Sequence, residues 1–285
     1  MHISLIVSTR NRPKQLARLL LSLKQQKLQE FEVIVVDQSD PESLARNSKE
    51  IAIAARSLAI QHNPTHTRGL SRGRNIGLGL ASGRLIAFPD DDCWYCDDVL
   101  LNVVNWFDEN NEYSFLSGQY TEPGVINPYF SNQPRVLENP TSSFDCSSVT
   151  LFFDRNTIES AKLRFDEDIG AGTDLPAGEE CDFIIRLITT GSVGFYDPTL
   201  IIYHQIERQA NNRLELDEKI EIAYGYVIGK HVFVPRIAIR LAVGLIKLLL
   251  DILLLRGGLP RLKSRMKGMR LGMKASRRNG DQYDE

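Results

Sequence analysis

The sequence predicts an α/β fold: a mainly parallel, Rossmann-type sheet flanked by helices, followed by a C-terminal helical appendage. Over the first 205 residues, short apolar runs alternate with segments whose apolar side chains recur at helical spacing. This alternation favours right-handed crossovers, which cover a parallel sheet with helices on both faces. The 285 residues suffice for one large domain with an appendage, and 42% hydrophobic and 25% charged residues are typical of a globular chain.

Each expected element follows from a local pattern. Strands are expected where apolar runs end at turn or breaker residues, at 2–8, 31–36, 57–62, 84–89, 113–119, 148–153 and 199–203. Helices are expected from Pro13 to Leu23, over 42–56, after the segment 68–75 as far as about Ala81, over 97–109 and through 178–188. The stretch 121–145 is rich in Pro, Asn and Ser and is expected to be irregular. We place a catalytic domain at 1–205 and a helical region at 206–285.

Three adjacent carboxylates, Asp90, Asp91 and Asp92, follow the apolar run 85–88 and Pro89. Their mutual repulsion would be relieved by a hard divalent cation such as Mg²⁺ or Mn²⁺, which prefers oxygen ligands. A solvated acidic loop is the alternative for this stretch taken alone. However, Thr9 and Asp37 end other expected strands, and open α/β sheets bind ligands at that edge. The order of these elements therefore favours a ligand site.

Six segments resemble the inverting glycosyltransferases of family 2, which have the GT-A fold. In chain order they are VSTRNRP (7–13), VVDQSD (35–40), SRGRNIG (71–77), FPDDD (88–92), GEECDFIIRL (178–187) and YH (203–204). The resemblance covers about the first 205 residues. It implies an enzyme that moves a sugar from a nucleotide-sugar donor to a hydroxyl-bearing glycan or glycolipid acceptor, as in polysaccharide or glycolipid assembly.

The resemblance also implies donor-binding residues. Thr9, Arg10 and Asp37 would hold the base and ribose of the nucleotide-sugar, where a carboxylate can accept hydrogen bonds. Arg74 would face the diphosphate, because a planar guanidinium matches phosphate geometry. Two rivals for that task, either of which can instead be a solvated surface charge, are Arg68 and Arg72.

For the metal, the resemblance implies Mn²⁺ or Mg²⁺ bound by Asp90, Asp92 and His204. Asp92 would be the direct ligand, Asp90 would lie nearer the ribose and the metal, and Asp91 would assist either. The cation would neutralise charge on the leaving nucleoside diphosphate. A lone histidine after a strand can equally be structural, so the role of His204 stays open.

The general base is implied at Glu180, where the family's usual pair is Glu-Asp and this chain has Glu179-Glu180. The extra methylene group moves the carboxylate by roughly one bond, and a base must come within hydrogen-bond reach of its proton. Asp182 and Glu179 are therefore lesser candidates. Any of the three can instead be a charge at a helix N-terminus.

The C-terminal part differs in character from the rest. Residues 256–278 hold nine Lys or Arg and no acid, on a chain with a formal net charge of −2. Before them, 233–255 is apolar except for one helical stripe made of Arg236, Arg240, Lys247 and Asp251. We expect peripheral contact of 233–278 with an anionic membrane. Packing on the catalytic domain or on a second copy in a homo-oligomer is the main alternative, and a membrane span a lesser one.

Other observations limit the function classes. No cleavable signal peptide is apparent, so we expect a cytoplasmic protein, peripheral on the inner face of the plasma membrane if the C-terminal region binds there. Cys93 and Cys96 lack a second cysteine pair, which disfavours zinc. The basic residues adjoin an apolar helix, which disfavours nucleic acid. A nucleotidyltransferase and a non-catalytic nucleotide-sugar-binding or scaffold protein remain as alternatives.

Overall fold

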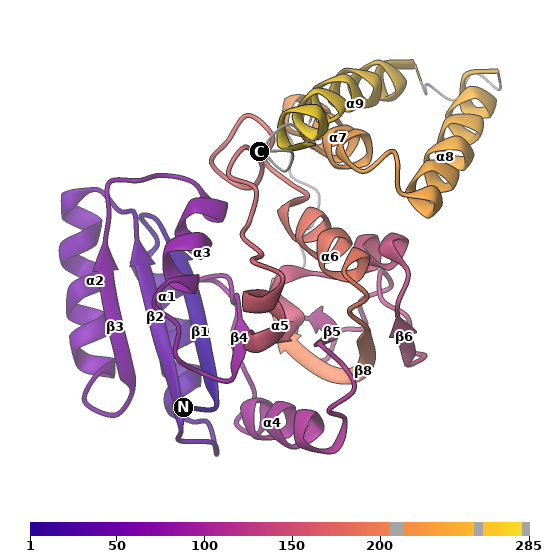
Figure 1. Cartoon of the computed structure of the whole chain (residues 1–285). Helices are drawn as coiled ribbons and strands as arrows, with labels where there is room; N and C mark the ends of the chain where they lie inside the picture. The colour runs from indigo at the N-terminus through magenta and orange to yellow at the C-terminus, as the bar shows by residue number, and fades with distance from the viewer. Residues whose placement is uncertain (206–213, 254–258, 281–285) are drawn as a thin grey trace.

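The computed structural model describes residues 1–205, 214–253 and 259–280 (Figure 1). An eight-stranded sheet in the order β3-β2-β1-β4-β7-β5-β8-β6 forms its centre. The strands are β1 (Ile3–Thr9), β2 (Phe31–Asp37), β3 (Ala59–Pro64), β4 (Leu85–Ala87), β5 (Phe115–Thr121), β6 (Arg135–Leu137), β7 (Leu151–Asp154) and β8 (Gly194–Tyr203). The helices are α1 (Pro13–Lys24), α2 (Pro41–Ala54), α3 (Leu70–Leu78), α4 (Val99–Glu109), α5 (Arg155–Ser160), α6 (Glu179–Thr189), α7 (Leu214–Lys230), α8 (Pro235–Leu253) and α9 (Leu259–Gly280).

The direction of the strands decides where ligands can bind. β1 pairs in parallel with β2 and β4, and β2 with β3. β7 is antiparallel to both β4 and β5, and β5 is parallel to β8, so β8 runs in the same direction as β1. The carboxyl ends of β1, β2, β4 and β8 therefore lie along one edge of the sheet, which is where such sheets bind ligands.

Alternation along the strands produces two cores. In β1, Leu5 and Val7 face α1, α2 and α4, whereas Ile6 faces the opposite side. That opposite side is covered by α3, α5 and α6, with Phe183 and Ile184 of α6 fully buried. This period of two is the pattern of a strand whose two faces are both covered.

A third cluster joins the C-terminal helices to the sheet domain. Cys181 and Ile185 of α6 pack against Val227 of α7 and Ile237 of α8. α7 and α9 lie side by side, while α8 extends away from them (Figure 1). The predicted boundary at 205/206 falls next to residues 206–213, which lie outside the described residues, and the division into two domains stays a prediction.

The α/β class, the flanking helices and the helical appendage are confirmed. The main difference lies in 121–145, predicted to be irregular, which contains β6 and a 3₁₀ helix, η1 (Pro140–Asp145). β6 is only three residues long and has one buried side chain, Leu137, so periodicity gives little signal for it. Among the described helices, none combines the length and apolar character needed to cross a membrane.

Candidate active site

The acidic loop after β4 is fastened to the end of β8. The backbone N–H of Trp94 donates to the Tyr203 carbonyl at 2.9 Å, and the N–H of Tyr203 donates to the Trp94 carbonyl at 3.0 Å. The two rings also pack against each other, and the Arg18 guanidinium lies 4.0 Å from the centre of the Trp94 ring. This short antiparallel bridge brings the residue after Tyr203, His204, beside the carboxylates.

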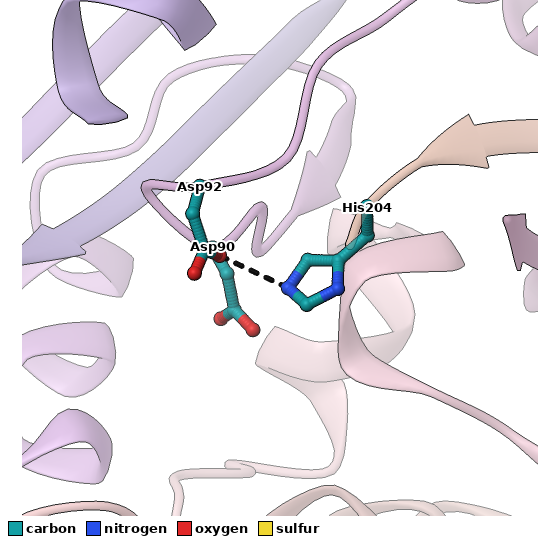
Figure 2. A group of neighbouring side chains, drawn as sticks. All are labelled: Asp90, Asp92 and His204. Atoms are coloured by element: carbon teal, nitrogen blue, oxygen red, sulfur yellow. Dashed lines mark hydrogen bonds and ion pairs between the residues drawn. The ribbon is translucent and has the colours of Figure 1, made fainter. Parts of the chain in front are cut away.

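Asp90, Asp92 and His204 form a group that fits a divalent cation (Figure 2). One ligand atom from each lies within 4.8 Å of the others, and His204 Nε2 is 3.0 Å from Asp92 Oδ1. The backbone N–H of His204 donates to the Thr121 carbonyl, which fixes the histidine at the end of β8. Two carboxylates and an imidazole are a donor set suited to Mn²⁺, and the carboxylates also suit Mg²⁺.

The charge state of His204 depends on this group. Burial alone would lower the pKa of His204, but the hydrogen bond and charge of Asp92, with the charge of Asp90, outweigh burial and raise the pKa. Asp92 has its pKa lowered, since His204 and Arg12 outweigh the effect of burial. Metals bind a neutral imidazole, so metal binding here would compete with protons.

Asp91 points away from this group and toward β1. The Thr9 hydroxyl donates to Asp91 Oδ2 at 2.7 Å, and Arg12 lies 2.7 Å from Asp91 Oδ1 and 2.9 Å from Asp92 Oδ2. Burial raises the pKa of Asp91 to about 6, against the opposing effects of Thr9 and Arg12. Arg12 was not among the residues expected at the site. Its place in the loop after β1, at the same edge as the acids, was the available signal.

Arg74 holds two acids from different elements. Its guanidinium lies 3.1 Å from Asp90 Oδ1 and 3.0 Å from Glu179 Oε1, and the side chain is 1% exposed. Arg74 therefore joins the loop after β4 to the first turn of α6. Direct contact with a diphosphate stays a prediction for Arg74, because both terminal nitrogens already bind carboxylates.

Glu180 lies in the first turn of α6. The preceding Gly178 has φ 88°, and a Cβ atom there would be 3.0 Å from Val227 of α7, so glycine permits both the turn and the close packing. Burial, and then the charge of Glu179, raise the pKa of Glu180 to about 8, and the charges of Arg74 and Asp90 also reach it. Because Arg74 pairs with both Asp90 and Glu179, the structure brings Glu180 to the same region as the acidic loop.

Asp182 is engaged elsewhere. Its fully buried carboxylate lies 2.7 Å from Arg186 of the same helix. It also lies 2.9 Å from Lys230, the last residue of α7, and 2.8 Å from His231, which follows α7. Arg186, Lys230 and His231 outweigh burial and hold the pKa of Asp182 well below its usual range. Because its oxygens contact cations of α6 and α7, the geometry favours a structural role over that of a base.

A cavity of about 280 Å³ opens beside the acidic loop at the ends of β1 and β2. Thr9, Arg10 and Arg12 line it, together with Gln38 and Asp91. Asp37 does not: its carboxylate is enclosed by Asn47, by His62 and by the N–H of Ser39. A contact between Asp37 and a nucleotide therefore stays a prediction, and Gln38 is the neighbouring side chain that lines the cavity.

The two rival arginines point to a different cavity. Arg68 pairs with Asp40 and Arg72 with Glu167, and both line a space of about 990 Å³ bordered by α7 and α9. Each pair has side chains roughly half exposed, which makes it a typical surface ion pair. Arg10 and Arg12 are therefore the arginines that line the smaller cavity.

Several curated relatives of this chain are named as glycosyltransferases. The chain is 30% identical over 195 residues to an uncharacterized glycosyltransferase of Haemophilus influenzae, covering 65% of this chain and 62% of that protein. It is 26% identical over 187 residues to the uncharacterized glycosyltransferase EpsJ of Bacillus subtilis, covering 61% and 54%. The match to WfaP of Escherichia coli, a UDP-Glc:α-D-GlcNAc-diphosphoundecaprenol β-1,3-glucosyltransferase, is 25% identical and covers 57% and 64%. Each match spans less than two thirds of the relative's length.

Solved structures share the fold at low identity. Staphylococcus aureus TarS is 19% identical with a TM-score of 0.63, covering 81% of this chain and 40% of TarS. The mannosyltransferase PcManGT of Pyrobaculum calidifontis, solved with GDP-Man and Mn²⁺, is 15% identical with a TM-score of 0.62, covering 96% and 86%. The family model of glycosyl transferase family 2 matches residues 4–167, more than half of the sequence. This chain therefore belongs to glycosyl transferase family 2.

Proposed function

We propose that this protein is a metal-dependent inverting glycosyltransferase that moves a sugar from a nucleotide-sugar to a hydroxyl acceptor. The observation that carries the proposal is the convergence of two acidic groups. Asp90 and Asp92 meet His204 at the end of β8, and Arg74 ties Asp90 to the first turn of α6, where Glu180 lies. A donor site and a base are both needed for sugar transfer, and the link through Arg74 supports assigning these roles to the two groups.

In the proposed reaction, Glu180 accepts the proton of the acceptor hydroxyl while that oxygen attacks the anomeric carbon. The bond from this carbon to the nucleoside diphosphate breaks in the same step, so a single displacement inverts the anomeric configuration. Asp90, Asp92 and His204 would hold a divalent cation, which supplies Lewis-acid stabilisation of charge on the diphosphate. Arg10 would contact the donor from the cavity that it lines.

The relatives support the choice of substrates. TarS has been solved with UDP-GlcNAc and PcManGT with GDP-Man and Mn²⁺. WfaP is named for a lipid-linked acceptor. We accordingly propose a nucleotide-sugar donor and a glycan or glycolipid acceptor, with 233–278 in peripheral contact with the inner face of the plasma membrane. Self-association stays a prediction.

The test is the fate of UDP-GlcNAc and GDP-mannose incubated with the protein and Mn²⁺. We expect slow release of the nucleoside diphosphate, and a rate at least about 100-fold lower for Asp92→Ala, since charge stabilisation by a metal is worth several kcal/mol. Asp97→Ala, an exposed acid paired with Lys27, is the matched control and should keep the full rate. Release of nucleoside monophosphate would instead favour a nucleotidyltransferase. If Mn²⁺ causes no release of any nucleotide, the result would favour a binding protein.

A further inference from the structure

Helix α8 presents two different faces within its described residues. Ile237 is fully buried and, with Leu241, packs into the cluster shared with α6 and α7. Ile239, Val243 and Ile246 are 63%, 61% and 59% exposed. These three are four and three residues apart, so they form one apolar stripe along the helix. Covering these exposed side chains with an apolar ligand would remove apolar surface from water.

Two arginines lie along the border of this stripe. Arg236 and Arg240 are exposed, one turn apart, and neither forms an ion pair with any residue that the structure describes. The Arg240 guanidinium lies 4.3 Å from the centre of the Phe144 ring, which holds it beside η1. The two cations thus lie close together and are free to bind an anion.

A groove of about 420 Å³ combines these groups. Arg236, Ile239, Arg240 and Val243 line it from α8, and the opposite wall comes from the start of η1, with Asn139 and Thr141. The groove is therefore lined both by polar and cationic groups and by the first two residues of the apolar stripe, Ile239 and Val243. A ligand that fits both would carry an anionic group joined to a hydrocarbon chain.

The groove is connected to the proposed base through η1. The Cys181 thiol donates to the Ser143 carbonyl at 3.4 Å, and Cys181 directly follows Glu180. Ser143 in turn precedes Phe144, against which Arg240 packs. The 3₁₀ helix η1 therefore contacts both the groove, through Thr141, and the first turn of α6, through Ser143.

We propose that this groove binds the phosphate of a lipid-linked acceptor: Arg236 and Arg240 bind the phosphate oxygens, and the hydrocarbon chain lies along Ile239, Val243 and Ile246. This inference rests on the proposed function, because it places the acceptor hydroxyl at Glu180. Guanidinium groups match phosphate oxygens in geometry and charge. The exposed stripe supplies the apolar surface that a chain leaving the groove would cover.

The test uses the full chain and neutral phosphatidylcholine vesicles that contain farnesyl diphosphate, with binding measured by co-sedimentation. We expect R236Q/R240Q to bind at least about tenfold more weakly than the wild type, because charge-assisted hydrogen bonds to phosphate are lost. The matched control, K49Q/R56Q, removes two exposed cations on and after α2 that have no ion pair in the described part of the chain, and should bind like the wild type.

Two further arms separate the sources of binding. I239S/V243S should weaken binding of farnesyl diphosphate but not of free inorganic diphosphate, since only the former has a chain. The wild type should bind more weakly to vesicles in which phosphatidylglycerol provides the same surface charge. If it binds both kinds of vesicle equally, and R236Q/R240Q does not weaken that binding, the inference is overturned in favour of a general membrane contact. The thermal shift caused by UDP or GDP with Mn²⁺ should persist in both variants; its absence from the wild type would instead contradict the proposed function.

Discussion

At the scale of single residues, the site depends on how carboxylates share cations. Asp91 and Asp92 share Arg12, while Asp90 and Glu179 share Arg74. Arg74 is almost fully buried, and removing one partner of a buried ion pair is much more costly than removing an exposed one. Glu180 differs from these acids, because burial and Glu179 push its pKa upward.

Glu180→Gln tests the proposed base directly. We expect transfer to fall by about 100- to 10,000-fold, the usual contribution of a general base. The folded-state pKa of Glu180 is raised to about 8, so its charged form opposes folding, and that loss of stability grows as the pH rises from the usual carboxyl pKa toward 8. Glu180→Gln should therefore be more stable than the wild type at pH 8, by at least about 1.4 kcal/mol if only one pKa unit is recovered.

Rates and denaturant unfolding of the same variant provide the readout. Wild-type transfer should increase with pH up to about 8, because the base must be deprotonated. The control Glu112→Gln, at an exposed position, should change neither the rate nor the stability. A Glu180→Gln protein with unchanged transfer would contradict the assignment and direct attention to Glu179.

Sequence reasoning identified the site better than the contacts within it. It placed Asp90, Asp92 and His204 together, and the structure has them in one group. It missed Arg12 and could not show that Asp37 is enclosed by Asn47 and His62. The strand ends of a parallel sheet are fixed by topology, whereas the partner chosen by each side chain depends on packing between distant segments.

At the scale of elements, one buried ion-pair network joins α6 to α7. Lys230 lies 2.7 Å from Asp166 and 2.9 Å from Asp182, and the Tyr226 hydroxyl also donates to Asp166. The acids in the first turn of α6 therefore have different partners: Glu179 pairs with Arg74, whereas Asp182 pairs with Lys230 at the end of α7. Sequence spacing alone left these roles open, because all three acids lie in the same helical turn.

Asp182→Asn should destabilise the protein by about 3 kcal/mol, since Lys230 would lose a partner in a buried network. The pKa of Asp182 is lowered on folding, so its contribution is present above the usual carboxyl pKa and lost as the pH falls below it. The difference between Asp182→Asn and wild type in urea unfolding should therefore be smaller in acid than at pH 7.

The comparison for this variant is Arg72→Gln, which breaks the half-exposed pair with Glu167 and should cost less than about 1 kcal/mol. Sugar transfer by Asp182→Asn should persist when it is measured in the absence of urea, where the variant is folded. A variant that keeps full stability but loses transfer would make Asp182 the base and would refute the structural role.

At the scale of the whole molecule, topology explains why remote segments make one site. β7 reverses direction between β4 and β5, yet β8 again runs parallel to β1, so loops from both halves of the chain meet at one edge. The alternating pattern predicted the parallel half well. It could not predict the short β6 or the packing of α7 against α9, because these depend on contacts between segments far apart in sequence.

The proposed function depends on a divalent cation bound by Asp90, Asp92 and His204. Its most direct test is titration of Mn²⁺ followed by electron paramagnetic resonance, with and without UDP, because bound Mn²⁺ loses the sharp signal of the free ion. We predict one bound ion per chain, tighter with UDP, and binding weakened by at least about tenfold in Asp92→Asn and in His204→Ala but not in Asp97→Asn. Equal Mn²⁺ binding by the wild type and all three variants would show that Asp92 and His204 do not bind the cation.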